Sequence, residues 1–506
     1  MDPDNPVAVD QLTCIVSLSD EKPPLQPDLN YSANALEMKE SLTYFEYCRL
    51  KFDEDFGYAS PNHVTYQDVT TNVSENGLEP KEKPRYRIST ANEDFQLCPS
   101  YPRFLIVPAE ISDDELKIVA NFRYQYRLPV ITWRYYKNGC VIARSSQPYV
   151  GLWGSRSDTD EKLIHLIATS SMVLSRAKHK PTPIEQDEKS DEQVNQVIKQ
   201  ETNEDKNESN LSKNEIDPIQ KHMMVVDCRS YTVAMVNRAK GGGCECTEYY
   251  PYCDIQFMGL ANIHSIRKSF DSLRYLQNCD MYSDAWESLV SSSKWLHYIS
   301  CLLKSAVTIS EAIEDDRSCL VHCSDGWDRT PQLVSLVQLM LDPYYRTYDG
   351  FRVLVEKEWI EFGHKFADRH GVMPEDDNSY EKCPIFQQWL DCVYQIVLQH
   401  SEAFEFNVVY LQSILYHSYS SLFGTFIGNS LNHKTQKNIF TQTSSLWPFL
   451  ENEKHCYIND NYVPKTGNNN IVTPSSEVED LRLWVEVYRP SSNDMISLSD
   501  IQSSKI

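Results

Sequence analysis

The sequence predicts an α/β fold in which a central mixed sheet is flanked by helices. Short apolar segments of strand length alternate with longer segments of helical periodicity. The 506 residues are 41% apolar, which is enough to form a sizeable core. Residues 318–321 also form a short apolar segment that leads, through a loop, into a strongly apolar helical segment at 331–341. We therefore expect this loop to join the end of a strand to the start of a helix.

The first predicted elements are a strand and a capped helix. Residues 104–107 (Phe-Leu-Ile-Val) have the apolar composition of a buried strand. Ser112 is followed three residues later by Glu115, which is the pattern of a capping box at a helix N-terminus. We expect this helix to end near Phe122.

Four further segments predict strands. Residues 130–136 and 140–144 predict two strands joined by a turn at Asn138-Gly139. Residues 223–227 and 255–260 are apolar and fit the interior of a covered sheet.

Helical periodicity dominates two later regions, in which apolar residues recur along one face. These residues are Trp286, Leu289, Val290, Leu296, Ile299, Leu302 and Leu303 in the first region, and Phe386, Trp389, Leu390, Val393, Ile396 and Val397 in the second. Packing in the core explains both stripes.

Charge and composition restrict the class of function. The formal net charge is −24, and its field repels polyanions, so we expect no nucleic acid among the partners. An anionic ligand would need a local basic pocket, for which Arg238, Lys240, Arg267 and Lys268 are candidates. Each of these four residues taken alone also fits a solvated surface position.

Cysteine usage and hydropathy predict the compartment. The 15 irregularly spaced cysteines indicate mostly reduced, buried thiols. The N-terminus lacks the basic start and apolar stretch of a signal peptide, and no apolar run approaches the ~18 residues that span a bilayer. We expect a soluble, cytoplasmic protein with peripheral membrane contact.

The loop that carries the predicted chemistry is His322-Cys323-Ser324-Asp325-Gly326-Trp327-Asp328-Arg329-Thr330. A strand-to-helix loop points successive backbone N–H groups inward, and the helix dipole adds positive potential, so the loop predicts a phosphate cradle. Cys323 would be stabilised there as a nucleophilic thiolate, and Arg329 would face it and hold phosphoryl oxygens. Gly326 permits the tight backbone path. A buried structural cysteine is the alternative, but the flanking strand, Thr-Pro and apolar helix favour catalysis.

This loop resembles the signature loop of the myotubularin phosphatases, within the protein tyrosine phosphatase superfamily. The resemblance covers about residues 85–490 and includes Tyr86-Arg87-Ile88-Ser89, Ser146-Gln147-Pro148, Asn237-Arg238-Ala239-Lys240-Gly241-Gly242-Gly243, Asn262-Ile263-His264, Phe362-Gly363-His364-Lys365-Phe366 and Phe404-Glu405-Phe406-Asn407. It implies the fold of that superfamily. It also implies removal of the 3-phosphate from phosphatidylinositol 3-phosphate and phosphatidylinositol 3,5-bisphosphate through a phosphocysteine, with no metal and no cofactor.

The resemblance also implies roles for individual residues. Asp325 is the candidate general acid, and Asp328 would orient water or bind the inositol ring, although the assignment of the two tasks stays open. Substrate contacts are implied for Asn237, Asn262, Ile263, Ser324, Asp325, Gly326, Trp327, Asp328, Arg329, Lys365 and Arg369. Lys365 stands where some relatives have Arg, and a lysine lacks the planar fork with which an arginine binds two oxygens.

Domain boundaries and partners follow from the same resemblance. We expect a phosphatase domain at 85–490, interrupted by a disordered acidic insertion at 178–221. Residues 1–84 would be partly disordered and at most the tail of a PH-GRAM domain, and 491–506 a disordered tail. Trp153-Gly154 and Gly243-Cys244-Glu245-Cys246 resemble the subgroup with a C-terminal FYVE finger, but no such finger is expected here. The implied partners are phosphoinositide-containing endosomal membranes and a homodimer or heterodimer with family members.

Two other functions remain open. Cys-x5-Arg chemistry also serves protein tyrosine and dual-specificity phosphatases, and the family includes catalytically weak scaffolds. Cys323, Asp325 and Arg329 are all present, which favours an enzyme. The triplet Cys244, Cys246 and Cys253 suggests zinc, but a fourth ligand at the usual spacing is missing, so we expect no metal site.

Overall fold

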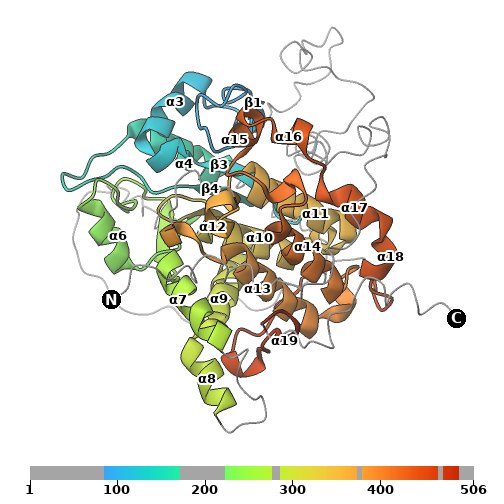
Figure 1. Cartoon of the computed structure of the whole chain (residues 1–506). Coiled ribbons are helices and arrows are strands. Elements are labelled where there is room, and N and C mark those ends of the chain that lie inside the picture. The colour runs from blue at the N-terminus through green and yellow to red at the C-terminus, as the bar shows by residue number, and fades with distance from the viewer. Residues whose placement is uncertain (1–84, 171–222, 276–284, 373–378, 465–470, 489–506) are drawn as a thin grey trace, which may run out of the picture.

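The structure, a computed structural model, describes residues 85–170, 223–275, 285–372, 379–464 and 471–488 (Figure 1). The predicted N-terminal segment (1–84), acidic insertion (178–221) and C-terminal tail (491–506) lie outside the described residues.

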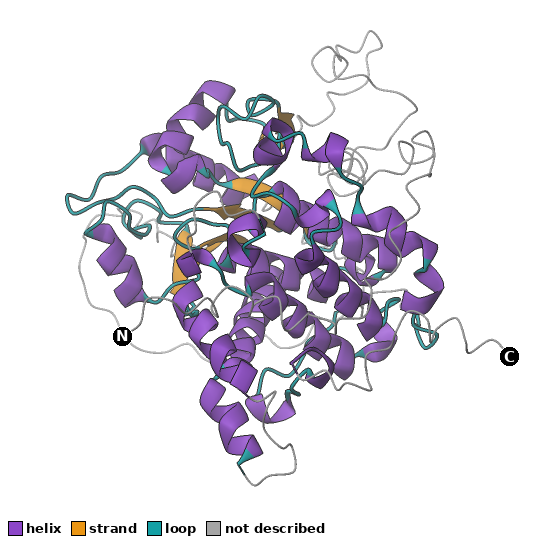
Figure 2. Cartoon of the chain, viewed as in Figure 1, coloured by secondary structure: helices purple, strands orange, loops and turns teal. Residues whose placement is uncertain are grey.

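A seven-stranded mixed sheet lies at the centre of the described part of the chain (Figure 2). Its strands are β1 (Tyr86–Ser89), β2 (Leu105–Pro108), β3 (Val130–Arg134), β4 (Val141–Ser145), β5 (Met223–Asp227), β6 (Cys253–Phe257) and β7 (Ser318–His322). Their order in the sheet is β1-β2-β3-β4-β7-β5-β6. The first four pair antiparallel, whereas β4, β7, β5 and β6 pair parallel. The predicted fold class is therefore confirmed.

Helices cover the sheet on both sides. The described α-helices are α3 (Asp113–Phe122), α4 (Asp158–Ser170), α6 (Tyr231–Arg238), α7 (Ile263–Arg274), α8 (Trp286–Ser293), α9 (Trp295–Glu314), α10 (Arg329–Leu341), α11 (Tyr348–Val355), α12 (Phe366–His370), α13 (Ile385–Gln399), α14 (Val408–Ser420), α15 (Leu431–Gln436), α16 (Ile439–Gln442), α17 (Leu446–Asn452), α18 (Lys454–Tyr457) and α19 (Val485–Tyr488). A π-helical turn (Glu356–Glu361) follows α11. Figure 1 shows α3 and α4 beside β3 and β4 and the larger helical body below these strands. In that body α9 and α10 pack on β7, and α13 packs on both helices.

Local sequence signals agree with these elements. The capping box at the start of α3 is present: the Ser112 hydroxyl accepts from the Glu115 N–H (3.3 Å), and the Glu115 carboxylate accepts from the Ser112 N–H (2.8 Å). The helix ends at Phe122, as predicted. The predicted pair of strands at 130–144 is the antiparallel pair β3 and β4, with Gly139 in the turn at φ +82°.

Two sequence predictions need correction. Strand β6 begins at Cys253 and lies at the edge of the sheet, half-buried, because only β5 pairs with it. The apolar stripe that starts at Trp286 belongs to two helices, because Lys294 adopts a left-handed conformation between them (φ +62°). At this break the Ser293 hydroxyl bonds the Val290 carbonyl and the Trp295 N–H, which replaces helical backbone bonding.

Within the described residues, none of the helices has both the length and the apolar character needed to cross a bilayer.

Candidate active site

The Cys323 loop, residues 322–330, is held between two buried elements. Strand β7 is buried along its whole length and is paired on both sides, with β4 and β5. Helix α10 begins at Arg329 and is buried from Thr330 to its end. The position of Cys323 is therefore fixed by the core, and only 3% of this residue is exposed.

The loop forms a tight backbone cradle around the Cys323 sulfur. The Gly326 N–H donates to Cys323 Sγ at 3.2 Å. Gly326 has φ +82°, and a Cβ atom at this position would lie 2.4 Å from the Ser145 carbonyl oxygen. Both conformation and space therefore require glycine here.

Two buried arginines hold the cradle from behind. The Gly326 carbonyl accepts hydrogen bonds from Arg127 Nη2 (2.8 Å) and Arg144 Nη2 (3.0 Å). Arg127 also donates to the Phe362 carbonyl (2.9 Å), and Arg144 to the Glu358 carboxylate (2.8 Å). Both arginines are fully buried, and their hydrogen bonds fix the Gly326 carbonyl on the side of the loop opposite to the Gly326 N–H, which faces Cys323 Sγ.

Asp328 is held as a carboxylate. Arg369 donates to both of its oxygens, from Nε at 3.0 Å and from Nη2 at 2.8 Å, and His364 Nδ1 lies 3.4 Å away. Burial would raise the pKa of Asp328, but Arg369 and His364 hold it well below its usual range. This residue is therefore a permanent anion that anchors the start of α10.

Asp325 has the opposite electrostatic character. Burial, followed by the nearby charge of Asp328, raises the pKa of Asp325, and the opposing charges of Lys365, Arg127 and Arg329 do not cancel this effect. The pKa values of the two aspartates of one loop are thus shifted in opposite directions. The sequence left their tasks open, and this difference favours Asp325 as the proton donor.

Arg329 occupies the first position of α10 and is half-buried. Its Nη1 lies 3.4 Å from the Leu260 carbonyl oxygen. A guanidinium carries five N–H donors, of which this contact uses one.

The predicted substrate residues lie at different depths around the loop. Asn237, in α6, donates to the Ser324 hydroxyl (3.2 Å), and Lys365 Nζ lies 4.5 Å from the centre of the Trp327 ring. Arg369 is 3% exposed and is engaged with Asp328 and Glu381, so in this structure it supports the loop. Its assignment as a substrate contact stays a prediction.

Asn262 and Ile263 lie at the start of α7. The exposed Asn262 caps this helix by accepting from the Ser265 N–H (2.9 Å). The Ile263 carbonyl accepts from the Cys383 thiol (3.1 Å), and the Cys383 N–H donates to the Arg369 carbonyl. These contacts join the start of α7 to the residue that anchors Asp328.

A second buried network was not predicted from the sequence. Arg123 bonds Asp160 and Glu245 (2.6 Å each), and the Glu245 carboxylate lies 3.0 Å from His322 Nε2. Burial alone would lower the pKa of His322, but Glu245 raises it. The Gln147 N–H also donates to the Ser324 carbonyl (3.0 Å). For the separate pair of Arg144 and Glu358 behind the loop, one signal was available: Arg144 interrupts an apolar strand, and a charge in such a strand needs a buried partner.

The candidate metal ligands do not form a recognisable centre. Cys244 is half-buried, Cys246 exposed and Cys253 buried, while the intervening Glu245 is engaged with Arg123 and His322.

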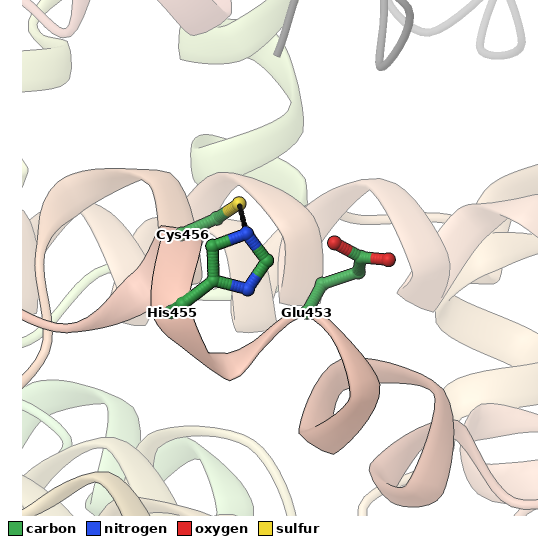
Figure 3. A group of neighbouring side chains, drawn as sticks. All are labelled: Glu453, His455 and Cys456. Carbon is green, nitrogen blue, oxygen red and sulfur yellow. Dashed lines mark hydrogen bonds between the residues drawn. The ribbon is translucent and has the colours of Figure 1, made fainter. Parts of the chain in front are cut away.

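A separate group, Glu453, His455 and Cys456, places its ligand atoms within 4.8 Å of one another (Figure 3). Among the described residues this group has three members, one fewer than a structural zinc site requires. We therefore assign no metal to it.

The fold and the loop together define a class of protein. A buried strand that ends in a Cys-x5-Arg cradle and continues into a buried helix, within a mixed sheet flanked by helices, is the arrangement of the cysteine-dependent phosphatases.

Comparisons with known proteins identify the family. Residues 46–435 match the model of the myotubularin-like phosphatase domain. The chain is 42% identical over 419 residues to phosphatidylinositol-3,5-bisphosphate 3-phosphatase MTMR4 of Xenopus laevis, which covers 82% of this chain and 38% of that protein. It is 42% identical over 411 residues to the Mus musculus protein of the same name, with 81% and 34% covered. Myotubularin of Xenopus tropicalis is 35% identical over 422 residues, with 83% and 62% covered.

The chain therefore belongs to the myotubularin-related phosphatase family. It spans only 34–38% of the length of these two MTMR4 proteins.

Proposed function

We propose that this chain is a phosphoinositide 3-phosphatase that acts on phosphatidylinositol 3-phosphate and phosphatidylinositol 3,5-bisphosphate. The observation that carries the proposal is the Cys323 sulfur, which is buried at the end of β7 and accepts a hydrogen bond from the Gly326 N–H. Family membership supports the substrate class, because the MTMR4 relatives are named phosphatidylinositol-3,5-bisphosphate 3-phosphatases.

In the first step the Cys323 thiolate attacks the phosphorus atom, so that an S–P bond forms and the bond to the inositol oxygen breaks. Asp325, whose pKa is raised by burial, gives its proton to that oxygen. Arg329 and the inward N–H groups stabilise the charge of the transferring phosphoryl group.

In the second step water attacks the phosphocysteine and the S–P bond breaks. The Asp325 carboxylate takes the proton from this water, which restores its acid form, and inorganic phosphate leaves. Asp328 stays ionised throughout, because its pKa is held far below neutral by Arg369 after burial is overcome. Its task is to hold the loop and to orient water or the inositol ring.

The test is phosphate release from short-chain phosphatidylinositol 3-phosphate, with the 4-phosphate and 5-phosphate isomers alongside. We expect turnover of the 3-phosphate alone and a loss on the order of 10⁴-fold or more in Cys323→Ser. Cys246→Ser, which changes an exposed thiol, is the matched control and should keep full activity. Faster turnover of a phosphotyrosyl peptide would identify a protein phosphatase instead, and no turnover by folded wild type would identify a scaffold.

We further propose that the chain is cytoplasmic and associates peripherally with endosomal membranes, because its proposed substrates are membrane lipids. Homodimers or heterodimers with family members are proposed from the family resemblance alone. Light scattering of the purified chain at increasing concentration tests self-association: a constant monomer mass would contradict the homodimer.

A further inference from the structure

Five large apolar side chains are exposed beside the Cys323 loop, on two segments far apart in the sequence. Leu152 (70% exposed) and Trp153 (98%) lie in the loop before α4, and Tyr231 (59%), Val233 (41%) and Val236 (54%) lie on α6. We call these five residues the apolar rim. Figure 1 shows α6, in green, at the margin of the molecule and outside the main helical body.

Backbone contacts lock the two segments together. The Gly151 N–H donates to the Gly242 carbonyl (2.9 Å), and Arg238 Nε donates to the Gly151 carbonyl (2.9 Å). Gly154 is at φ +71°, and a Cβ atom there would lie 3.3 Å from Arg238 Nη2. Leu152 and Trp153 are therefore presented by a short, tied loop next to the C-terminal end of α6.

The apolar rim is also tied to the catalytic machinery. Asn237, which follows Val236 in α6, donates to the hydroxyl of Ser324, the residue after the nucleophile. The Gln147 N–H, on the segment that leads to Leu152, donates to the Ser324 carbonyl (3.0 Å). Both segments that carry the rim are therefore hydrogen-bonded directly to the Cys323 loop, at Ser324.

The charge around the apolar rim differs from that of the whole chain. The net charge is −24, yet residues 116–157 and 228–244 contain neither Asp nor Glu. These segments contribute Arg238 and Lys240 beside Val236. Arg156, beyond Trp153, is paired with Asp158 and Glu161. A surface with exposed Trp and aliphatic side chains and with the basic neighbours Arg238 and Lys240 is complementary to the interface of an anionic bilayer.

We propose that the apolar rim is a membrane-docking surface, in which Trp153 and Leu152 enter the bilayer interface while Arg238 and Lys240 face lipid phosphates. This inference rests on the proposed function, because it concerns how a lipid headgroup reaches a nucleophile that is 3% exposed. Docking through the rim brings the membrane plane to the entrance of the Cys323 loop. A flat acidic surface would instead keep the headgroup at a distance.

Binding to vesicles tests the docking surface directly. The full chain is sedimented with phosphatidylcholine vesicles that do or do not contain phosphatidylserine. We expect Trp153→Ala to weaken binding about tenfold, since burial of a large aromatic side chain at the interface is lost. Phe440→Ala is the matched control, because Phe440 on α16 is an aromatic side chain that is 57% exposed, and α16 lies across the molecule from α6 (Figure 1). Equal binding by Trp153→Ala and wild type would overturn the proposal.

Fluorescence locates the contact. Trp153 is the most exposed of the nine tryptophans, and the other eight are buried or half-buried. Vesicles of brominated phosphatidylcholine should therefore quench part of the emission of wild type, and Trp153→Phe should remove that part. Quenching that persists unchanged in Trp153→Phe would place the membrane contact elsewhere and overturn the proposal.

Enzyme kinetics distinguish a failure of the membrane-docking proposal from a failure of the proposed phosphatase function. Trp153→Ala should turn over soluble short-chain phosphatidylinositol 3-phosphate like wild type, but the same lipid in vesicles about tenfold more slowly. If wild type does not turn over the soluble lipid, the proposed function is wrong. The vesicle-binding experiment would still test the docking surface, because binding does not require turnover. A dimer of wild type that Trp153→Ala converts to monomer would show that the rim is a protein interface, and would overturn docking.

Discussion

Behind the Cys323 loop, charged side chains are buried, whereas in front of it apolar side chains are exposed. The loop support behind consists of Arg127, Arg144, Glu358 and Arg369, each 3% exposed or less. The apolar rim in front reaches 98% exposure at Trp153. Both regions invert the usual distribution of residue types. The buried charges are hydrogen-bonded within the chain and fix the geometry of the loop, while the exposed apolar groups are available for binding.

The largest effect is expected when one charge is removed from the loop support, which tests whether the buried charges stabilise the chain. Glu358 accepts hydrogen bonds from Arg144 (2.8 Å), Thr132 (2.6 Å) and Gln338 (2.7 Å), and is fully buried. Glu358→Gln removes the charge that balances Arg144 and Lys357. We expect the free energy of unfolding to fall by about 3–5 kcal/mol, because an uncompensated cation stays buried.

Denaturant unfolding of the purified chain measures this loss. Glu311→Gln is the matched control, since Glu311 is exposed on α9, and it should stay within about 0.5 kcal/mol of wild type. A change below about 1 kcal/mol in Glu358→Gln would mean that the buried charges do not stabilise the loop.

Asp328→Asn breaks the pair with Arg369, and we expect a smaller loss of about 2–4 kcal/mol because Arg369 keeps its contact with Glu381. The lowered pKa of Asp328 determines how its contribution to stability changes with pH. The stabilisation is present above the usual Asp value of about 4 and is lost as the pH falls through the lower folded value. The gap between wild type and variant, measured by unfolding, should therefore narrow below about pH 4. Asp460→Asn, at an exposed position, should show no gap.

Asp325→Asn should have the opposite effect to Asp328→Asn: little change in stability and a large loss of activity. The raised pKa of Asp325 means that ionisation costs folding free energy, so its contribution is lost as the pH rises through that value. At neutral pH the variant should be as stable as wild type or slightly more stable, while kcat falls by about 10²–10⁴ because the proton donor is lost. The wild-type kcat, measured as a function of pH, should decline as the pH rises through the Asp325 pKa. The kcat of the variant should not show this decline. A variant that unfolds more easily than Asp328→Asn would contradict the assignment.

Local signals in the sequence predicted much of the fold. The capping box at Ser112, the antiparallel pair of strands at 130–144 and the strand-loop-helix around Cys323 each depend on residues that are neighbours in sequence. The edge position of β6 was not predictable in this way, because it depends on the order in which distant strands pair.

The candidate active site was likewise predictable only where it depends on residues that are neighbours in sequence. Cys323, Asp325, Asp328 and Arg329 are all within one loop, so a single motif contained them. What separates Asp325 from Asp328 is Arg369, which approaches from 41 residues further along the chain. The support from Arg127 reaches across 199 residues to Gly326, and nothing in the local pattern of Arg127 indicates it.

The smallest expected effect on stability is at Trp153 in the apolar rim, which can be compared with a second tryptophan, Trp327, in the Cys323 loop. Trp153 is 98% exposed, whereas Trp327, in the Cys323 loop, is 8% exposed and lies against Lys365. Trp153→Ala should change the free energy of unfolding by no more than about 0.5 kcal/mol, because no packing is lost. Trp327→Ala should cost about 3–5 kcal/mol, because it leaves a cavity. Denaturant unfolding of both variants measures the difference, and a comparable loss in Trp153→Ala would show that the rim belongs to the folded core and is not free to bind.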